Sequence, residues 1–481
     1  MSPRSVHRSL IMGTVTVHLP PELWDRIFDL LPFKDQLEKA TVCRAWNDRV
    51  ARWATLRLTC PTAARSEEHL STIRHSLRKY RSFSAEAIRT DEDYQCFQKA
   101  LEECERKFCV QRFRFWYVTG AIFERLMKEH YEWLRSARCI VVNLCEEERF
   151  PVHVLRDLTS LRELRLLNVS DTSVDWTSIE DRFEHITKLT VDAAWYFNDE
   201  ALEQLVEAIC RCRNLTELTL RSNDTTNLAK LAESLSKLEK LSLMGMHIRL
   251  AEDSLRFPYL KYLNFDIGSF VFDKPCLFVQ APLLQTLLIA KRTIPFVKFP
   301  ESTRLWRLHL YGYSLSVAHP CFTTVKDLSL TTWEPANQEA VVEEIQLFPN
   351  VVYLSVKLKS KDCNIVVPDA AIFQHMTRLH LNNFVLSMEF FQNVARARML
   401  EHLSLEECNF FLYSPDADDE VPLQLSHLSY FNIKRVSMPM TVEKFPIIGN
   451  EDQPPVVMVD KLRTHLWRSD RFNNVFSSRR D

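Results

Sequence analysis

Cysteine and histidine are the residue types in this chain that could act as nucleophiles or metal ligands. The chain has 13 cysteines and 15 histidines. Its closest cysteine pair, Cys210 and Cys212, forms a Cys-x-Cys with no histidine near it, which is a poor match to zinc spacings. The histidines do not combine with cysteine and aspartate at a spacing typical of nucleophilic catalysis. These patterns predict no catalytic residue, no metal site and no cofactor.

Glycine is scarce in the sequence. Six of the 481 residues are glycine, about 1% against an average of roughly 7%. Loops that cradle phosphates and dinucleotides need glycine for close backbone approach and for positive φ. The sequence contains no P-loop, no GxGxxG, no GxSxG and no HExxH motif. We therefore expect the chain not to be an enzyme of those classes.

The bulk composition is that of a soluble protein with well-packed cores. Hydrophobic residues make up 46% and charged residues 26%, and the formal net charge of -2 favours neither nucleic acid nor membrane as a partner. A chain of 481 residues is too long for one compact domain unless it is an elongated repeat array. The scattered, odd-numbered cysteines predict reduced thiols in the cytoplasm or nucleus, and we expect no signal peptide.

A short pattern of apolar residues recurs through most of the chain, with apolar side chains at its first, fourth and sixth positions. Clear copies begin at residues 161, 186, 215, 238, 260, 284, 305, 325, 351, 376, 400 and 428, and weaker copies begin at 53, 110 and 137, with a doubtful copy at 80. Side chains alternate along a strand, so the fourth and sixth residues share one face. Between copies the spacing turns helical, as in residues 198–209, where Leu202, Leu205, Val206 and Ile209 share a face.

This repeat resembles the leucine-rich-repeat family. The resemblance implies an α/β solenoid over residues 53–436, a curved horseshoe with parallel strands inside and helices outside, whose first repeats to about residue 136 are irregular. The family's ninth position is usually Asn or Cys, and only Cys145, Asn223 and Cys408 fit it here, so we expect irregular loops. Residues 437–481 are predicted to be a C-terminal tail, partly extended. The alternative is an ordinary α/β protein in which these strings recur by coincidence.

Apolar residues near the N-terminus form two stripes on a helix, where a surface helix needs one. Leu23, Ile27 and Leu30 form one stripe, and Trp24, Phe28 and Leu31 form the other. A unit of about 35 residues is too small to bury both stripes internally. The first repeat covers part of this surface, and a partner protein is the natural cover for the rest.

The order of residues in this segment resembles the F-box, a three-helix domain, placed here at residues 15–52. The matching positions are Leu19, Pro20, Glu22, Leu23, Ile27, Phe28, Leu31, Pro32, Asp35, Val42, Cys43, Arg44 and Trp46. Gln36 departs from the pattern, because the family more often has an apolar residue there. The resemblance implies contacts with the Skp adaptor by Leu19, Pro20, Leu23, Ile27, Leu31, Val42, Cys43 and Trp46. The alternative is a helical cap that seals the first repeat.

The two resemblances together imply the substrate-recognition subunit of an SCF-type E3 ubiquitin ligase. The Skp adaptor would join the chain to a cullin and a RING subunit, and the repeats would hold a protein target for ubiquitination and proteasomal degradation. The chain itself would be non-catalytic. Two alternatives stay open: a leucine-rich-repeat interaction scaffold without ligase function, and an F-box protein that uses the adaptor outside a ligase. A secreted receptor is disfavoured, because no signal or membrane span is found.

The third, fifth and seventh residues of each copy are predicted to point to the inner side of the solenoid. Large and charged residues gather there from residue 260 onward, and aromatic residues and arginine are enriched at binding hot spots. The candidate substrate-binding residues are Tyr262, Arg307, His309, Tyr311, Tyr353, Arg378, His380 and His402. They predict binding of an acidic or phosphorylated segment. The alternative is an ordinary solvated sheet face.

Overall fold

The computed structural model describes two compact units, Met1–Asn143 and Leu144–Asp481. The described residues are 55–59, 80–104, 108–144, 150–170, 173–176, 181–193, 199–222, 225–245, 247–250, 254–266, 269–272, 277–290, 297–299, 303–312, 323–332, 345–358, 375–411, 424–425, 427–434, 447–448 and 456–460. The predicted F-box at 15–52 therefore lies outside the described residues. No helix in the described part of the chain is long and apolar enough to cross a membrane.

In the described part of the first unit, four strands pair in parallel in chain order. They are β1 (Thr55–Thr59), β2 (Tyr80–Glu86), β3 (Phe108–Trp116) and β4 (Cys139–Asn143), with a register shift between β2 and β3. These strands coincide with the weaker copies of the repeat at 53, 80, 110 and 137, so the doubtful copy is a strand. The described residues of this unit also form the helices α5 (Asp91–Cys104), α6 (Gly120–Glu129) and α7 (Tyr131–Leu134).

Aromatic side chains form the core between these strands and helices. The rings of Phe83 and Phe113 each pack edge-on against Trp133, with centroid distances of 5.0 and 4.7 Å. Phe97 of α5 packs on Phe83 at 5.7 Å. All three phenylalanines are at most 1% exposed. Edge-to-face pairs of this kind stabilise a core beyond the area that they bury, so this cluster holds α5 and α7 against β2 and β3.

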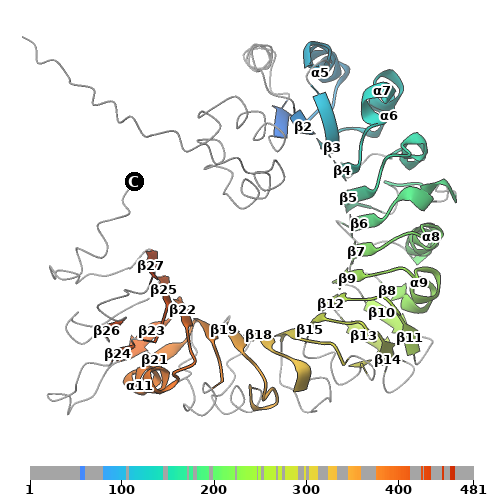
Figure 1. Ribbon diagram of the computed structural model, residues 1–481. Helices are drawn as coiled ribbons and strands as arrows, with labels where there is room; N and C mark the ends of the chain where they lie inside the picture. Colours follow the sequence, from blue (N-terminus) through green and yellow to red (C-terminus); the bar gives the residue numbers. More distant parts are fainter. Residues whose placement is uncertain are drawn as a thin grey trace, which may run out of the picture. The chain divides into compact units, whose positions relative to one another are not determined.

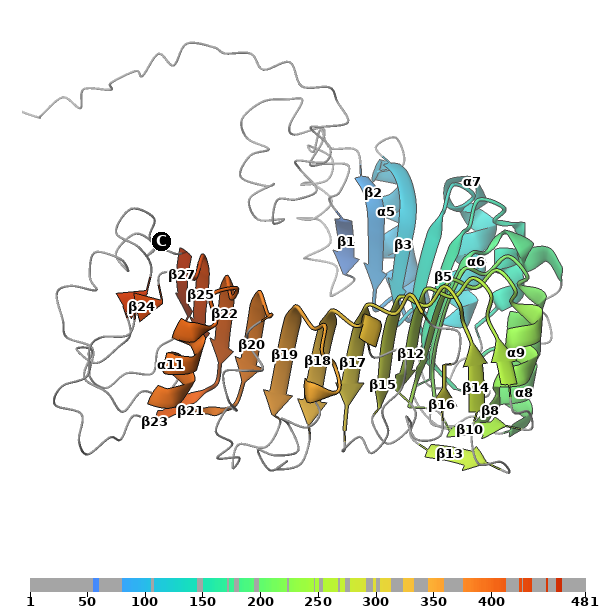
Figure 2. The same ribbon diagram turned by 60° about the horizontal axis from the view of Figure 1, so that its bottom comes forward.

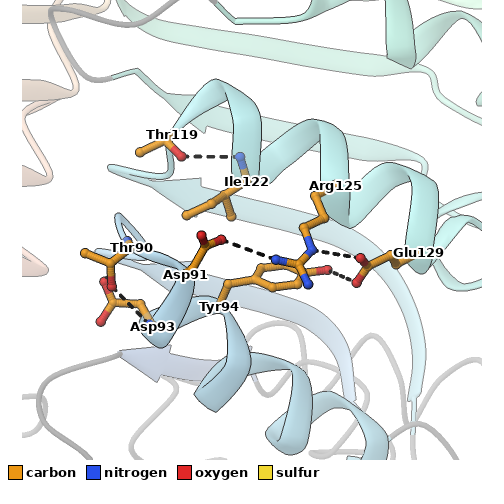
Figure 3. Close-up of polar contacts among 8 residues, drawn as sticks. All are labelled: Thr90, Asp91, Asp93, Tyr94, Thr119, Ile122, Arg125 and Glu129. Carbon is orange, nitrogen blue, oxygen red and sulfur yellow. Dashed lines mark hydrogen bonds and ion pairs between the residues drawn. The ribbon is translucent and has the colours of Figure 1, made fainter.

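Side-chain caps begin two of the helices. Before α5, the Thr90 hydroxyl accepts from the amide of Asp93, and the Asp93 carboxylate accepts from the amide of Thr90 (Figure 3). This reciprocal pair is a capping box, which satisfies two amides at a helix start. Thr119 caps α6 by accepting from the amide of Ile122 at 3.3 Å. The order Thr-Asp-Glu-Asp therefore explains locally why α5 starts at Asp91.

A polar cluster joins α5 to α6 in the same unit (Figure 3). The Tyr94 hydroxyl donates to Glu129 Oε2 at 2.8 Å, and Arg125 Nε donates to Glu129 Oε1 at 2.7 Å. The Arg125 guanidinium also lies over the Tyr94 ring, 4.4 Å from its centroid. The hydrogen bond from Arg125 is the largest cause that holds the pKa of Glu129 below its ordinary value. Every polar group of this cluster has a partner, so it is a structural contact.

The second unit is built on thirteen strands that pair in parallel in chain order (Figure 1). They are β5 (Glu163–Val169), β6 (Lys188–Ala193), β7 (Glu217–Arg221), β9 (Lys240–Met244), β12 (Tyr262–Asp266), β15 (Thr286–Ala290), β17 (Arg307–Tyr311), β18 (Asp327–Thr332), β19 (Tyr353–Leu358), β20 (Arg378–Asn382), β22 (His402–Glu406), β25 (Tyr430–Lys434) and β27 (Val456–Asp460). The first twelve begin at the third residue of the twelve clear copies. This confirms the predicted solenoid.

The parallel ladder continues beyond residue 436. β27 pairs with β25 in register, inside the segment predicted as a partly extended tail. A short parallel pair, β24 (Gln424–Leu425) with β26 (Ile447–Ile448), lies in the same region of the chain. The register places Val457 and Val459 at the fourth and sixth positions of a further copy, but the first position of that copy is Pro454. The periodicity of the repeat alone therefore did not predict β27.

The other side of the solenoid carries three α-helices in the described part, α8 (Asp199–Arg211), α9 (Leu228–Ser234) and α11 (Met388–Arg396) (Figure 1). Leu202, Leu205, Val206 and Ile209 of α8 are at most 4% exposed, as the helical spacing predicts. Two 3-10 helices, η2 (Val152–Asp157) and η4 (Asp181–His185), precede α8. The predicted outer helices are thus confirmed at three places.

Short strands replace helices in several other connections. One parallel sheet contains β8 (Thr225–Asn227), β10 (His247–Leu250) and β13 (Ser269–Phe272), and a second contains β11 (Ser254–Arg256), β14 (Leu277–Gln280) and β16 (Val297–Lys298) (Figure 2). β21 (Val385–Ser387) pairs with β23 (Asn409–Phe411). Sequences such as SFVF and LFVQ are rich in β-branched and aromatic residues, which favour strands over helices.

The eighth residue of the repeat ends the inner strand in the left-handed conformation. Positive φ occurs at this position in seven copies, at Ala87, Tyr117, Asn168, Gly245, Gly312, Asn383 and Glu407. In several copies the amide of this residue donates to the carbonyl of the seventh residue of the next copy, as Gly245 does to Asp266 and Gly312 does to Thr331. The turn directs the chain away from the sheet while it preserves one more ladder hydrogen bond.

Side chains at these turns also bond to the neighbouring coil. Asn383 Nδ2 donates to the Leu358 carbonyl at 3.1 Å, and the Cys408 thiol lies 3.6 Å from the Leu381 carbonyl. Cys408 is fully buried, in keeping with the predicted role of the ninth position. Cys145 and Asn223, the other two predicted residues, lie outside the described residues. Asn383 at the eighth position was not predicted.

Candidate functional site on the inner face of the second unit

The inner face of the second unit consists of the third, fifth and seventh residues of each clear copy. The fourth and sixth residues point to the core, as shown by Leu308 and Leu310 of β17, which are 0% exposed. Their neighbours on β17, Arg307 and His309, are exposed and half-buried respectively. The alternation of side chains thus separates a solvent-accessible polar face from an apolar core.

All eight candidate substrate-binding residues lie on this inner face. Tyr262 comes from β12; Arg307, His309 and Tyr311 come from β17; Tyr353 comes from β19; Arg378 and His380 come from β20; His402 comes from β22. The strand order places β15 between β12 and β17, and β18 between β17 and β19. The candidates therefore form two groups, one over β12–β18 and one over β19–β22.

Polar groups in the β12–β18 group hydrogen-bond to one another. Arg307 Nε donates to Asp327 Oδ2 at 2.6 Å, and the Asp327 side chain is 13% exposed. The Tyr311 hydroxyl donates to Asn264 Oδ1 at 3.3 Å, and Asn264 Nδ2 donates to Ser242 Oγ at 3.0 Å. These contacts use much of the hydrogen-bonding capacity of the group. They favour a rigid support over a recognition surface.

Two further residues of this group have pKa values shifted by burial. Burial raises the pKa of Tyr262, whose ring carries the Lys240 ammonium 4.9 Å from its centroid. Burial lowers the pKa of His309, and the opposing effect of the Asp327 charge is smaller. His309 Nε2 lies 3.1 Å from the Thr331 hydroxyl, a distance suited to a hydrogen bond from a neutral imidazole. We expect His309 to be neutral near pH 7.

His309 should make the stability of the second unit depend on pH. Its pKa is lower in the folded chain than the ordinary value of about 6.5, so below that pH the unfolded chain binds a proton that the folded chain does not. The free energy of unfolding should therefore fall as the pH falls below about 6.5. Urea unfolding between about pH 7 and pH 5 should show a shallower fall for His309→Gln than for wild type.

Equal slopes for wild type and His309→Gln would show that the buried imidazole is not the group that titrates.

The β19–β22 group differs because its cations are unpaired. Lys357 and Arg378 are exposed, and neither side chain makes a hydrogen bond or an ion pair with another described residue. Four other cations on the inner face have acidic partners, whereas the Lys240 ammonium lies over the Tyr262 ring. These pairs are Arg165 with Glu163, Lys188 with Glu217, Arg221 with Asp192 and Arg307 with Asp327.

Histidine and tyrosine side chains lie beside these cations. His380 Nε2 is 3.8 Å from Glu406 Oε2, and the His402 ring lies 5.5 Å from the Tyr430 ring. Tyr353 is paired in register with Arg378, and Arg378 with His402. This part of the inner face therefore combines aromatic surface with unneutralised positive charge.

The described residues offer little support for metal or thiol chemistry. They contain no group of three or more His, Cys, Asp or Glu side chains arranged to hold a metal ion. Burial raises the pKa of Cys212 to about 12 and that of Cys408 to about 11. Burial also raises the pKa of Cys210. These thiols stay protonated near neutral pH and are poor nucleophiles.

Sequence reasoning missed the acidic partners of two candidates. Asp327 pairs with Arg307, and Glu406 lies close to His380. Each acid stands at the third or seventh position of the adjacent copy. Alignment of neighbouring copies in register would have found both.

Comparison with known proteins identifies the N-terminal segment. A family model for the F-box-like domain matches residues 16–59, so the chain carries an F-box-like domain there. All eight predicted adaptor contacts fall within this range, and all lie outside the described residues. Among solved structures, an internalin from Listeria monocytogenes is similar over 70% of this chain and 83% of its own, with 13% identity and a TM-score of 0.34. No curated protein matches the sequence of the chain.

Proposed function

We propose that this protein is the substrate-recognition subunit of an SCF-type E3 ubiquitin ligase. The F-box-like domain would bind the Skp adaptor, which joins it to a cullin and a RING subunit. The inner face of the second unit would bind a protein target. The observation that carries the proposal is an F-box-like domain at residues 16–59 in the same chain as a parallel-strand solenoid with an accessible polar face.

The mechanism that we propose is proximity. The receptor holds its target beside the ubiquitin-charged enzyme and so raises the effective concentration of the target's lysines. The chain itself then needs neither a catalytic residue nor a cofactor. Ubiquitination would direct the target to proteasomal degradation. We place this activity in the cytoplasm or the nucleus, where buried cysteines persist as thiols.

Adaptor binding should depend on the apolar residues of the F-box-like domain. A pull-down of the full chain should recover the Skp adaptor and cullin, and the triple variant Leu19→Ala, Pro20→Ala, Ile27→Ala should recover neither. The substitutions truncate apolar side chains that we propose contact the adaptor, and truncation of buried apolar anchors costs the most binding energy. The variant Arg378→Glu, on the inner face, is the control and should retain both partners.

The outcomes separate the alternatives. Recovery of neither the adaptor nor cullin by the wild type would contradict the proposal and favour a leucine-rich-repeat interaction scaffold without ligase function. Recovery of the adaptor without cullin would indicate a role for the adaptor outside a ligase. Equal recovery by wild type and the triple variant would show that the contacts lie elsewhere in the chain.

A further inference from the structure

Charge is distributed unevenly over the inner face of the second unit. The described ion pairs neutralise arginine and lysine on β5, β6, β7 and β17. Lys357 on β19 and Arg378 on β20 are exposed and have no acidic partner among the described residues. An exposed surface with unpaired cations is electrostatically complementary to an anionic partner. The ligand of this region should therefore carry negative charge.

The strand register determines the separation of the two cations. Arg378 pairs with Tyr353, and Lys357 pairs with Asn382, so the cations lie four residues apart along two adjacent strands. A rise of about 3.3 Å per residue and a strand spacing of about 4.8 Å place their backbone positions about 14 Å apart. An extended peptide covers this distance in about four residues.

The surface between the two cations can accommodate a peptide chain. Ser355 and His380 pair in register midway between them, and both side chains are half-buried. The small serine leaves room above the sheet, and the half-buried Tyr353 adds an aromatic side chain beside Arg378. Aromatic residues and arginine together are typical of the centre of a binding surface.

The surroundings favour carboxylates over phosphates. Phosphate sites generally bring several cationic donors together on one group. Here Arg378 and Lys357 lie at opposite ends of the region. Thr331 and Asn382 pair in register with Lys357 on its two sides. Glu406 pairs in register with Asn382 and adds negative charge near the Lys357 end. A dianion would be repelled there more strongly than a carboxylate.

We propose that the β19–β22 part of the inner face binds an extended acidic peptide segment of the target. Arg378 and Lys357 each pair with one carboxylate, and the two acidic residues are four positions apart in the ligand. This inference rests on the proposed role of the inner face in holding a protein target. The proposal excludes Arg307 from the eight candidate substrate-binding residues. Arg307 already pairs with Asp327, so it does not contact the ligand.

Peptide selection on the full-length chain tests the proposal directly. The probe is a displayed library of random peptides of about 12 residues, long enough to span both cations. Wild type should enrich peptides with two acidic residues four positions apart. Arg378→Glu should replace the acidic preference at one of these positions with a preference for lysine or arginine, and Lys357→Glu should do so at the other. Arg398→Glu, at an exposed residue that follows α11, is the matched control and should select as wild type does.

Synthetic peptides of the enriched sequence then separate the sources of negative charge. Fluorescence anisotropy should show that either charge reversal weakens binding of the glutamate peptide by about tenfold or more. The affinity should also fall as salt is raised. Phosphoserine in place of the glutamates should not improve binding.

Several outcomes would overturn the proposal. They are no enrichment of any peptide, enriched peptides without the acidic pair, an unchanged preference after both charge reversals, or much tighter binding of the phosphoserine peptide. The adaptor pull-down on the same variants keeps this test separate from the proposed function. A chain that binds the adaptor but not acidic peptides contradicts only the inference about the ligand.

Discussion

Replacing Phe113 with alanine should lower the free energy of unfolding of the first unit by about 3–5 kcal/mol. Phe113 is 0% exposed and lies at the centre of the aromatic core. Its ring packs 4.7 Å from Trp133 and 6.2 Å from Phe83. Alanine would leave a cavity between β3, β2 and α7 that the surrounding rings are too rigid to fill. Hydrogen exchange of peptides from β2, β3 and α5 should accelerate strongly.

Tyr117 is the control for this substitution. It immediately follows β3 but is 43% exposed, with the Arg89 guanidinium 5.7 Å from its ring centroid. Tyr117→Ala should cost about 1 kcal/mol or less, the typical value of an exposed cation–π contact. Similar losses for the two variants would show that the aromatic cluster is not the core that stabilises this unit.

Replacing Leu308 with alanine should cost the second unit about 2–5 kcal/mol, with the effect concentrated near β17. Leu308 is 0% exposed and pairs in register with Leu287 of β15 and Leu328 of β18. In a solenoid each coil contacts only its neighbours, so weakening one coil uncouples the unfolding of the coils on its two sides. Denaturant unfolding should therefore broaden, and hydrogen exchange should rise most at β15, β17 and β18.

Trp306 is the matched control for Leu308. It lies two residues away in the chain, is 42% exposed, and has the Arg307 guanidinium 4.7 Å from its ring centroid. Trp306→Ala should change the stability of the unit by about 1 kcal/mol or less. A uniform rise in hydrogen exchange from α8 to α11 in Leu308→Ala would show that the solenoid unfolds as one cooperative body.

The inner face combines two kinds of surface. Over β12–β18, hydrogen bonds such as Tyr311 to Asn264 and Arg307 to Asp327 fix side chains in place. Over β19–β22, Lys357 and Arg378 stay available to a ligand.

Most of the architecture was predictable because it rests on local periodicity. The apolar residues at the fourth and sixth positions alternate with polar ones, and the copies recur at the period of one coil. Each clear copy therefore became a parallel strand, and α8 formed where its four apolar residues share a face. The residues of the inner face were predictable for the same reason. Their contacts do not follow from local periodicity, because each joins side chains of different copies, such as Arg307 with Asp327 and Tyr311 with Asn264.

The conformation of the turns also depends on contacts between coils and not on local sequence alone. Positive φ recurs at the eighth position, yet the residues there include Ala87, Tyr117 and Glu407, which do not favour that conformation by type. The backbone adopts it because the amide then donates to the next coil, as Ala87 does to Trp116 and Asn383 does to Glu406. No local pattern encodes a bond to a coil that is distant in sequence.

The sequence by itself determined the F-box-like segment, the solenoid and the residues on its inner face. Those features follow from the order and period of apolar side chains, which act over a few residues. The tertiary structure decided that Arg307 is neutralised by Asp327 while Arg378 and Lys357 are left exposed. It also decided which outer strands pair, such as β13 with β10 and β14 with β11. The physical reason is that charge pairing and sheet pairing join side chains and strands from different coils, so they form only after the coils stack in register.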